Sequence, residues 1–128
     1  MQIKEAIESV LALKPGYEYT NDSVELKNWL NDCDQMIWKQ LISHYKQNEY
    51  PEMPDYTDKP NTTELMVPEP YSRLYIHYLA GQISYWNRET TGYINEKEQY
   101  TALLNAFIAE YMRMHEHKPM PYFKGVSL

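Results

Sequence analysis

The sequence predicts an all-α protein: a small bundle of about four helices, with a long Pro-rich loop between the second and third helices and an extended C-terminal tail. Apolar residues recur at three- and four-residue spacing over four segments, which is the pattern of a buried helix face. Glycine is scarce, at 4 of 128 residues, and the 8 prolines fall between or beside these segments. A chain of 128 residues fits one domain. We expect the bundle at residues 1–118, including the loop at 47–70, and the tail at residues 119–128.

The first helix is expected from Gln2 to Leu13, and Pro15 ends it by disfavouring helical backbone at the preceding residue. The second helix is expected to follow a run of capping side chains at residues 20–23 and to end near Lys46. The apolar stripes of these two helices consist of Ile3, Ala6, Ile7, Val10 and Leu11, and of Leu26, Trp29, Leu30, Cys33, Ile37, Leu41 and Ile42. Because Cys33 lies inside its stripe, we expect it to be a small buried apolar residue.

The segment from 47 to 70 contains five prolines and lacks the alternation of a strand, so it is expected to be a loop. Loops of this length in a compact domain are usually functional or disordered. Acidic residues are concentrated in it: Glu49, Glu52, Asp55, Asp58, Glu64 and Glu69. Two interpretations remain open, a solvated surface loop and a binding arm.

The third helix is expected to open at Pro70, which suits the first helical position, and to stop near Arg88. After a turn over residues 89–92, the fourth helix should run to about His115, antiparallel to the third because the connection is short. The apolar face of the third helix comprises Leu74, Tyr75, Tyr78, Leu79, Ile83 and Trp86, flanked by Tyr71 and Tyr85. The buried side of the fourth is expected to comprise Ile94, Tyr100, Leu104, Phe107, Ile108 and Tyr111, with Ala102, Ala106 and Ala109 allowing tight packing.

The composition restricts the class of function. The net charge is −6 and no basic stripe is visible, which argues against sequence-specific nucleic-acid binding. DNA could still pass the protein without being bound by it. Tyrosine accounts for 13 residues, a composition that suits either an interface or a core with tyrosines at its rim. The single cysteine excludes an internal disulfide, and the sequence shows neither a signal peptide nor an apolar run of membrane-spanning length. We therefore expect a reducing cytoplasm during synthesis and no membrane partner.

The sequence contains no recognisable arrangement for catalysis. A Gly-rich phosphate loop, a paired-Cys metal signature and a Gly-flanked nucleophilic serine are all missing. We therefore expect no enzyme activity, no cofactor and no metal site. One alternative is a metal-binding enzyme that uses His115, His117 and nearby carboxylates, but residues two apart point in different directions on a helix, which makes a poor chelate there.

Several segments resemble small proteins encoded by tailed phages and prophages of Gram-positive bacteria. The resemblance is carried by residues 65–79, where a Pro-x-Pro-Tyr step leads into a Tyr-rich helix, and by residues 82–87, 93–95 and 105–107. It also includes Tyr111, Arg113 and His115, and the opening from Ile3 to Pro15. The chain is therefore similar to the phage head-tail connector proteins, also called adaptor or head-completion proteins.

The resemblance implies a helical subunit that assembles as a ring beneath the portal vertex after DNA packaging. The implied partners are the portal protein, head-completion or tail proteins, and further copies of this chain. The implied location is the virion, and the host cytoplasm during assembly. An alternative is another morphogenesis protein of the same kind of phage, either a tail-completion protein or an assembly factor absent from the virion.

Four aromatic residues are candidates for the interface. Tyr122 and Phe123, in the tail, could anchor it in a pocket on a neighbouring subunit, as aromatic hot spots do. Tyr71 and Tyr75 are further candidates, although their helical spacing favours ordinary core packing.

Overall fold

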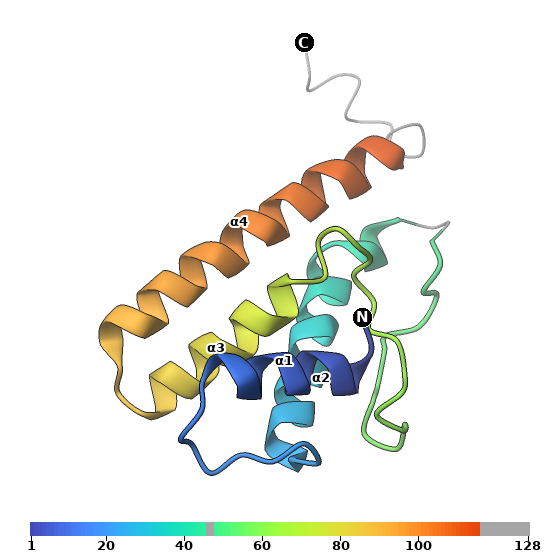
Figure 1. Ribbon diagram of the computed structural model, residues 1–128. Helices are drawn as coiled ribbons and strands as arrows, with labels where there is room; N and C mark the ends of the chain where they lie inside the picture. Colours follow the sequence, from blue (N-terminus) through green and yellow to red (C-terminus); the bar gives the residue numbers. More distant parts are fainter. Residues whose placement is uncertain (46–47, 116–128) are drawn as a thin grey trace.

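In the computed structural model, which describes residues 1–45 and 48–115, the chain forms four α-helices (Figure 1). These helices are α1 (Ile3–Leu13), α2 (Val24–Gln40), α3 (Leu74–Trp86) and α4 (Thr90–Met114), and a short 3₁₀ helix, η1 (Ile42–His44), follows α2. The described residues contain no β-strand, and their one isolated bridge joins Gln2 to Glu64. The predicted all-α class is therefore confirmed.

Helix α3 is the centre of the packing. Both α1 and α2 contact it, and α4 runs along it in the antiparallel direction after a short turn (Figure 1). Among the described helices, α4 runs close to α3 only, although its Tyr100 hydroxyl lies 3.7 Å from Cys33 Sγ on α2. The predicted antiparallel pairing of the third and fourth helices is confirmed, and one side of α4 is left without a neighbouring helix.

The core contains most of the predicted apolar stripes of the first three helices, whereas Leu11, Trp29 and Tyr78 are half-buried. Cys33 is fully buried, as expected, and so is the charged residue Asp34. The core contributed by the helices consists of Ile3, Ala6, Ile7, Val10, Leu26, Leu30, Cys33, Ile37, Leu74, Tyr75, Leu79, Ala80, Ile83, Phe107 and Tyr111.

The second helix ends earlier than predicted. Regular α-helix stops at Gln40 rather than near Lys46, because Leu41 departs from helical geometry, with φ −126° and ψ −66°. The next turn is tighter, since the amides of His44 and Tyr45 donate to carbonyls only three residues back. Leu41 and Ile42 nevertheless remain buried, so the stripe was predicted correctly while the helix end was not.

The third helix begins later than predicted, at Leu74 instead of Pro70. Residues 68–73 form consecutive turns in which Tyr71 N–H donates to the Pro68 carbonyl and Leu74 N–H to the Tyr71 carbonyl. The first four-residue hydrogen bond of this region joins His77 N–H to the Arg73 carbonyl, at 3.3 Å. Pro70 therefore lies before the helix, in a turn.

The connection between α3 and α4 is also shorter than predicted. Arg88 adopts a left-handed backbone, with φ 59°, and α4 begins at Thr90, so Gly92 lies inside the helix rather than in the turn. A Cβ atom at Gly92 would lie 3.0 Å from Ser84 Oγ, which explains why glycine suits this close approach of the two helices.

Part of the predicted buried side of α4 faces solvent. Ile94, Ala102, Ala106 and Ala109 are exposed, and so is Trp86 at the end of α3. The prediction was wrong because it assumed that α4 has neighbours on a broad face, whereas among the described helices α3 is the one that runs along it.

The tail predicted at residues 119–128 and the domain boundary at residue 118 lie outside the described residues. Within the described ranges, no helix combines the length and the apolar character needed to cross a membrane.

Candidate interaction site

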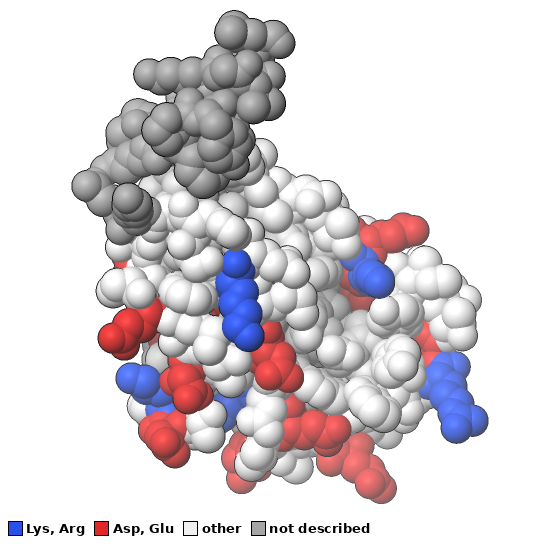
Figure 2. All heavy atoms as spheres, turned by 180° about the vertical axis from the view of Figure 1, so that it is seen from behind, with Lys and Arg blue, Asp and Glu red and all other residues white. Residues whose placement is uncertain are grey.

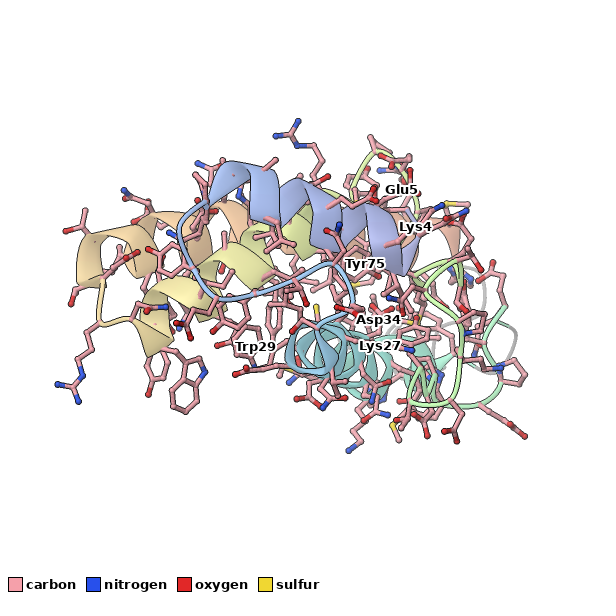
Figure 3. The ribbon with its side chains drawn as sticks, turned by 60° about the horizontal axis from the view of Figure 1, so that its bottom comes forward. Lys4, Glu5, Lys27, Trp29, Asp34 and Tyr75 are labelled. Carbon is pink, nitrogen blue, oxygen red and sulfur yellow. The ribbon has the colours of Figure 1, made fainter. Side chains whose placement is uncertain are left out.

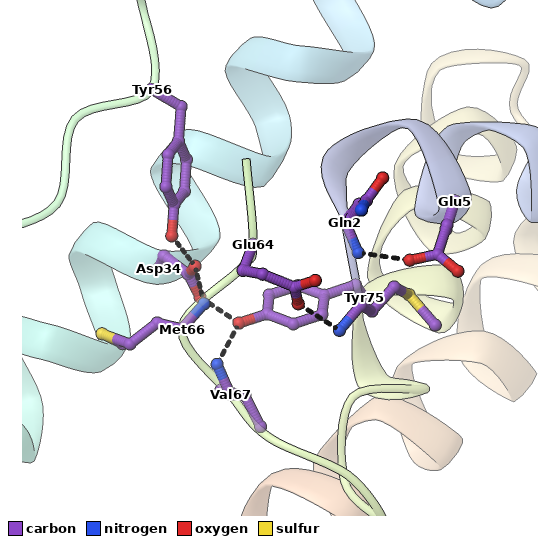
Figure 4. A network of polar contacts seen from close by, with 9 residues as sticks. Gln2, Glu5, Asp34, Tyr56, Glu64, Met66, Val67 and Tyr75 are labelled. Atoms are coloured by element: carbon purple, nitrogen blue, oxygen red, sulfur yellow. Dashed lines mark hydrogen bonds and ion pairs between the residues drawn. The ribbon is translucent and has the colours of Figure 1, made fainter. Parts of the chain in front are cut away.

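A buried carboxylate joins the long connection between α2 and α3 to the helices. Asp34 on α2 has no exposed surface. Its side chain accepts hydrogen bonds from the Tyr75 hydroxyl at 2.5 Å, the Tyr56 hydroxyl at 2.5 Å and the Met66 amide at 3.0 Å (Figure 4). The Tyr75 oxygen in turn accepts from the Val67 amide, at 2.7 Å. Figure 3 shows Asp34 and Tyr75 between α1 and α2, inside the molecule.

Side chains of α2 also bind the backbone of this connection. Trp38 Nε1 donates to the Tyr50 carbonyl at 2.8 Å, and Gln35 Nε2 donates to the Pro54 carbonyl at 3.0 Å. Asn31 Oδ1 accepts from the amide of residue 56 at 2.9 Å. The described part of the connection therefore lies against α2, while its acidic side chains remain exposed: Glu49, Glu52, Asp55, Asp58, Glu64 and Glu69.

Burial controls the protonation of these groups. Loss of water raises the pKa of Asp34, although the hydrogen bonds from Tyr56, Tyr75 and the Met66 amide act in the opposite direction. The pKa of Tyr75 is also raised, first by burial and then by the neighbouring carboxylate. Because these groups are sealed from solvent and bonded to one another, they hold the connection in one arrangement against the helices.

One wall of an apolar groove depends on this network. The groove has a volume of about 260 Å³ and lies between the connection and the C-terminal end of α4. Met66, whose amide binds Asp34, lines it from the connection. Its lining consists of Ile42, Glu49, Tyr50, Met66, Pro68, Phe107, Glu110, Tyr111, Met114 and His115. We call this surface the groove.

Aromatic rings on α4 form the opposite wall. Tyr111 stacks on His115 with ring centroids 4.0 Å apart, and it makes an edge contact with Tyr45 at 5.3 Å. Phe107 lies one turn earlier, with its ring centroid 5.8 Å from that of Tyr111. His115 Nδ1 lies 2.8 Å from the carbonyl oxygen of Tyr111, so this histidine is engaged at the end of the helix. His117 lies outside the described residues, and within them no three His, Cys, Asp or Glu side chains are grouped as metal ligands.

The Tyr111 hydroxyl is a buried polar group that makes no hydrogen bond within the described part of the chain. Burial, followed by the charge of Glu49 and the nearby Tyr45, raises its pKa to about 12. A buried polar group without a partner costs free energy, of the order of 1–3 kcal/mol. The groove therefore offers an apolar surface together with one hydroxyl that lacks a hydrogen-bond partner in this structure.

A second apolar surface lies where α3 meets α4. Trp86 is 63% exposed and Tyr85 is 56% exposed, and their rings meet edge to face with centroids 5.6 Å apart. The Tyr93 ring lies 5.5 Å from that of Tyr85, and Ile94 beside it is also exposed. We call Tyr85, Trp86, Tyr93 and Ile94 the hairpin cluster. The sequence did not predict this cluster, because Trp86 follows the spacing of the buried face.

The turn that carries the hairpin cluster is tied to α1. Lys14 Nζ lies 2.9 Å from Ser84 Oγ and 3.2 Å from Glu89 Oε1, and the Tyr17 hydroxyl donates to the same Glu89 carboxylate. These contacts lower the pKa of Glu89, with the Tyr17 hydrogen bond as the largest cause. The turn is thus held at a defined position, and the exposed rings with it.

The four predicted interface residues differ in how far the structure exposes or describes them. Tyr75 has no exposed surface and its hydroxyl is bound to Asp34, so it belongs to the core and cannot contact a partner in this fold. Tyr71 is half-buried, with its ring centroid 6.0 Å from that of Phe107. Tyr122 and Phe123 lie outside the described residues.

Charges are mixed on the surface. On the face seen in Figure 2, Asp and Glu side chains are spread over the lower part and Lys and Arg side chains lie among them.

Comparison of the chain with protein-family models, curated proteins and solved structures gave no match.

Replacing Tyr75 with Phe should lower the free energy of unfolding by about 1–3 kcal/mol, because Val67 N–H is left without its acceptor and Asp34 without one donor. Urea unfolding followed by circular dichroism measures the change. The matched control is Tyr85→Phe, whose exposed hydroxyl should matter by less than about 0.5 kcal/mol. Equal effects of the two substitutions would contradict the role of the network.

The raised pKa of Asp34 predicts how stability depends on pH. A carboxyl whose pKa is higher in the folded state binds a proton at pH values where the unfolded chain has lost it, so its contribution is largest at low pH and is lost as the pH rises through the folded pKa. The free energy of unfolding of the unmodified protein minus that of Asp34→Asn should therefore fall as the pH rises from about 4 to 8. A difference that grows over this range would mean that the three donors lower the pKa instead.

Proposed function

We propose that this chain is a structural subunit of the head-tail connector type, which assembles as a ring on the portal vertex of a tailed phage. The observation that carries the proposal is the presence of two separate apolar surfaces, the groove and the hairpin cluster, at the two ends of α4. A subunit in a ring contacts one neighbour on each side through two different surfaces. A single apolar patch would instead suit a symmetric pair.

The dimensions of α4 support this use. The helix has 25 residues, which corresponds to about 37 Å. The hairpin cluster lies at its first turn, and the groove is lined by its last two to three turns, from Phe107 to His115. The two surfaces are thus held apart on one continuous helix, so one subunit can contact neighbours on opposite sides.

The acidic side chains of the connection between α2 and α3 suit a wall past which DNA slides. All six are exposed, and negative charges do not trap phosphates. The proposed partners are the portal protein, head-completion or tail proteins and further copies of the chain. Tyr122 and Phe123 are proposed to anchor the tail on a neighbour or on the portal.

Negative-stain electron microscopy of the purified protein mixed with the portal protein encoded beside it tests the proposal. An added ring of density at one end of the portal is expected. No added density at high protein excess would contradict the connector role. Mass spectrometry of purified virions separates the alternative, because an assembly factor would be absent from them, whereas a connector is present at a multiple matching the portal.

Deleting residues 119–128 should leave the helices folded but abolish assembly on the portal, because the aromatic anchor is lost. Circular dichroism and thermal unfolding check that the fold is retained, and the microscopy assay measures assembly. The paired substitution Tyr122→Ala and Phe123→Ala serves as the finer variant and should have the same effect. A truncated protein that still forms complete rings would contradict this role of the tail.

A further inference from the structure

We propose that the groove of one copy of this chain receives the hairpin cluster of a second copy, with Trp86 as the inserted side chain. This contact rests on the proposed function for its setting in a ring, since it names the surfaces through which neighbouring subunits would meet. It can be tested without a portal, as a contact between two copies alone.

The two surfaces match in size and character. The groove has a volume of about 260 Å³ and a mostly apolar lining, with Met66, Pro68 and Phe107 among its walls. Trp86, 63% exposed, has a large flat ring held edge to face against Tyr85. Aromatic side chains of this kind dominate the energetics of interfaces when they fill a pocket on the partner.

Polar atoms on the two surfaces also complement each other. The Tyr111 hydroxyl, buried against the groove, makes no hydrogen bond with any described residue. The indole N–H of Trp86 belongs to a side chain that is 63% exposed, and it has no acceptor in residues 1–45 and 48–115. An indole can donate only and a phenol oxygen can accept, so insertion of Trp86 would give the buried Tyr111 oxygen a donor and give the indole N–H an acceptor as it leaves water.

The contact must join two molecules. Trp86 precedes the first turn of α4, and the groove is lined by its last turns, from Phe107 to His115. The part of α4 between them, from Thr90 to Phe107, is about 26 Å long, so the cluster of one copy cannot reach its own groove. A contact between two different surfaces leaves one groove and one cluster open at the ends of a pair, and further copies can add until a ring closes.

Charges beside the two surfaces favour this orientation. Arg88 is exposed next to Trp86 and forms no ion pair within the described ranges. Glu49 and Glu110 lie on the groove, and Glu110 has only Arg113 of its own helix as an ion-pair partner there, at 3.1 Å. If two grooves paired, the carboxylates of the two copies would repel each other. If a hairpin cluster enters the groove instead, Arg88 comes close to Glu49 and Glu110, which favours the contact.

The contact would bury little surface area, so it should form only at high protein concentration or on a template. Two aromatic side chains bury roughly 150–250 Å² each, whereas stable protein interfaces bury about 1,200–2,000 Å² in total. The contact alone should therefore be weak, so the isolated protein should be mainly monomeric and should associate at high concentration or on a template.

Cross-linking between defined positions tests the contact. Thr90→Cys and Ala109→Cys place exposed thiols beside the hairpin cluster and the groove without altering either surface, and Cys33 is buried. The two single variants, one of them ¹⁵N-labelled, are mixed at high concentration with a short bismaleimide, and the links are identified by mass spectrometry. Links between positions 90 and 109 should be more frequent, relative to 90–90 and 109–109 links, than random collisions between the two variants would make them.

Substitutions in the two surfaces make the test specific. Trp86→Ala should lower the yield of 90–109 links about tenfold, as loss of an interface anchor does. Tyr111→Phe, which keeps the ring, should lower it about threefold. The matched control is Val24→Ala, an equally exposed apolar residue on α2, which should leave the yield unchanged. Arg88→Glu should weaken the contact, and Glu49→Arg in the partner copy should restore it.

Three results would overturn the proposal. Predominant 90–90 links would show that two hairpin clusters pack symmetrically, and a statistical mixture insensitive to Trp86→Ala would show that no such contact exists. Appearance of 90–109 links only after deletion of residues 116–128 would identify the tail as the occupant of the groove in the intact chain. The portal assay is independent: specific links without added density on the portal would retain this contact and contradict only the connector role.

Discussion

The structure depends on the hydrogen bonding of one buried carboxylate. A carboxylate removed from water is costly unless donors replace the water, and Asp34 takes its described donors from two hydroxyls and an amide. Tyr75 comes from α3, whereas Tyr56 and Met66 come from the connection between α2 and α3. If the connection moved away from the helices, the buried Asp34 carboxylate would lose the donors that Tyr56 and Met66 provide. This constraint makes a segment without regular secondary structure part of the core.

The same constraint shapes the surface that we propose to be functional. Met66 binds Asp34 through its amide and lines the groove with its side chain, so the buried network positions a wall of the groove. The other wall belongs to α4, whose neighbouring helix along its length is α3 and whose C-terminal end also contacts Tyr45 through Tyr111. At the far end, Lys14 and Glu89 fix the turn that carries Trp86. Both apolar surfaces are therefore formed before any partner binds, which reduces the entropy that binding would cost.

The sequence predicted the helices and most of their buried stripes, because periodicity reports directly on which side of a helix is apolar. It did not predict the network at Asp34, although a signal was present: Asp34 lies four residues after Leu30 and three before Ile37, inside the apolar stripe of α2. Its donors are 22 to 41 residues away along the chain, and no local pattern connects them. The exposure of Trp86 was missed for a different reason, since periodicity does not reveal how many neighbours a helix has.

If Asp34 makes the connection a rigid part of the core, the groove exists in the isolated protein. Native-state hydrogen exchange of the Met66 and Val67 amides tests it most directly, because both amides are bound within the network. The account predicts that they exchange only through global unfolding, with the same free energy as core amides of α3. Exchange of these two amides through a local opening, at a much lower free energy than that of α3, would contradict it.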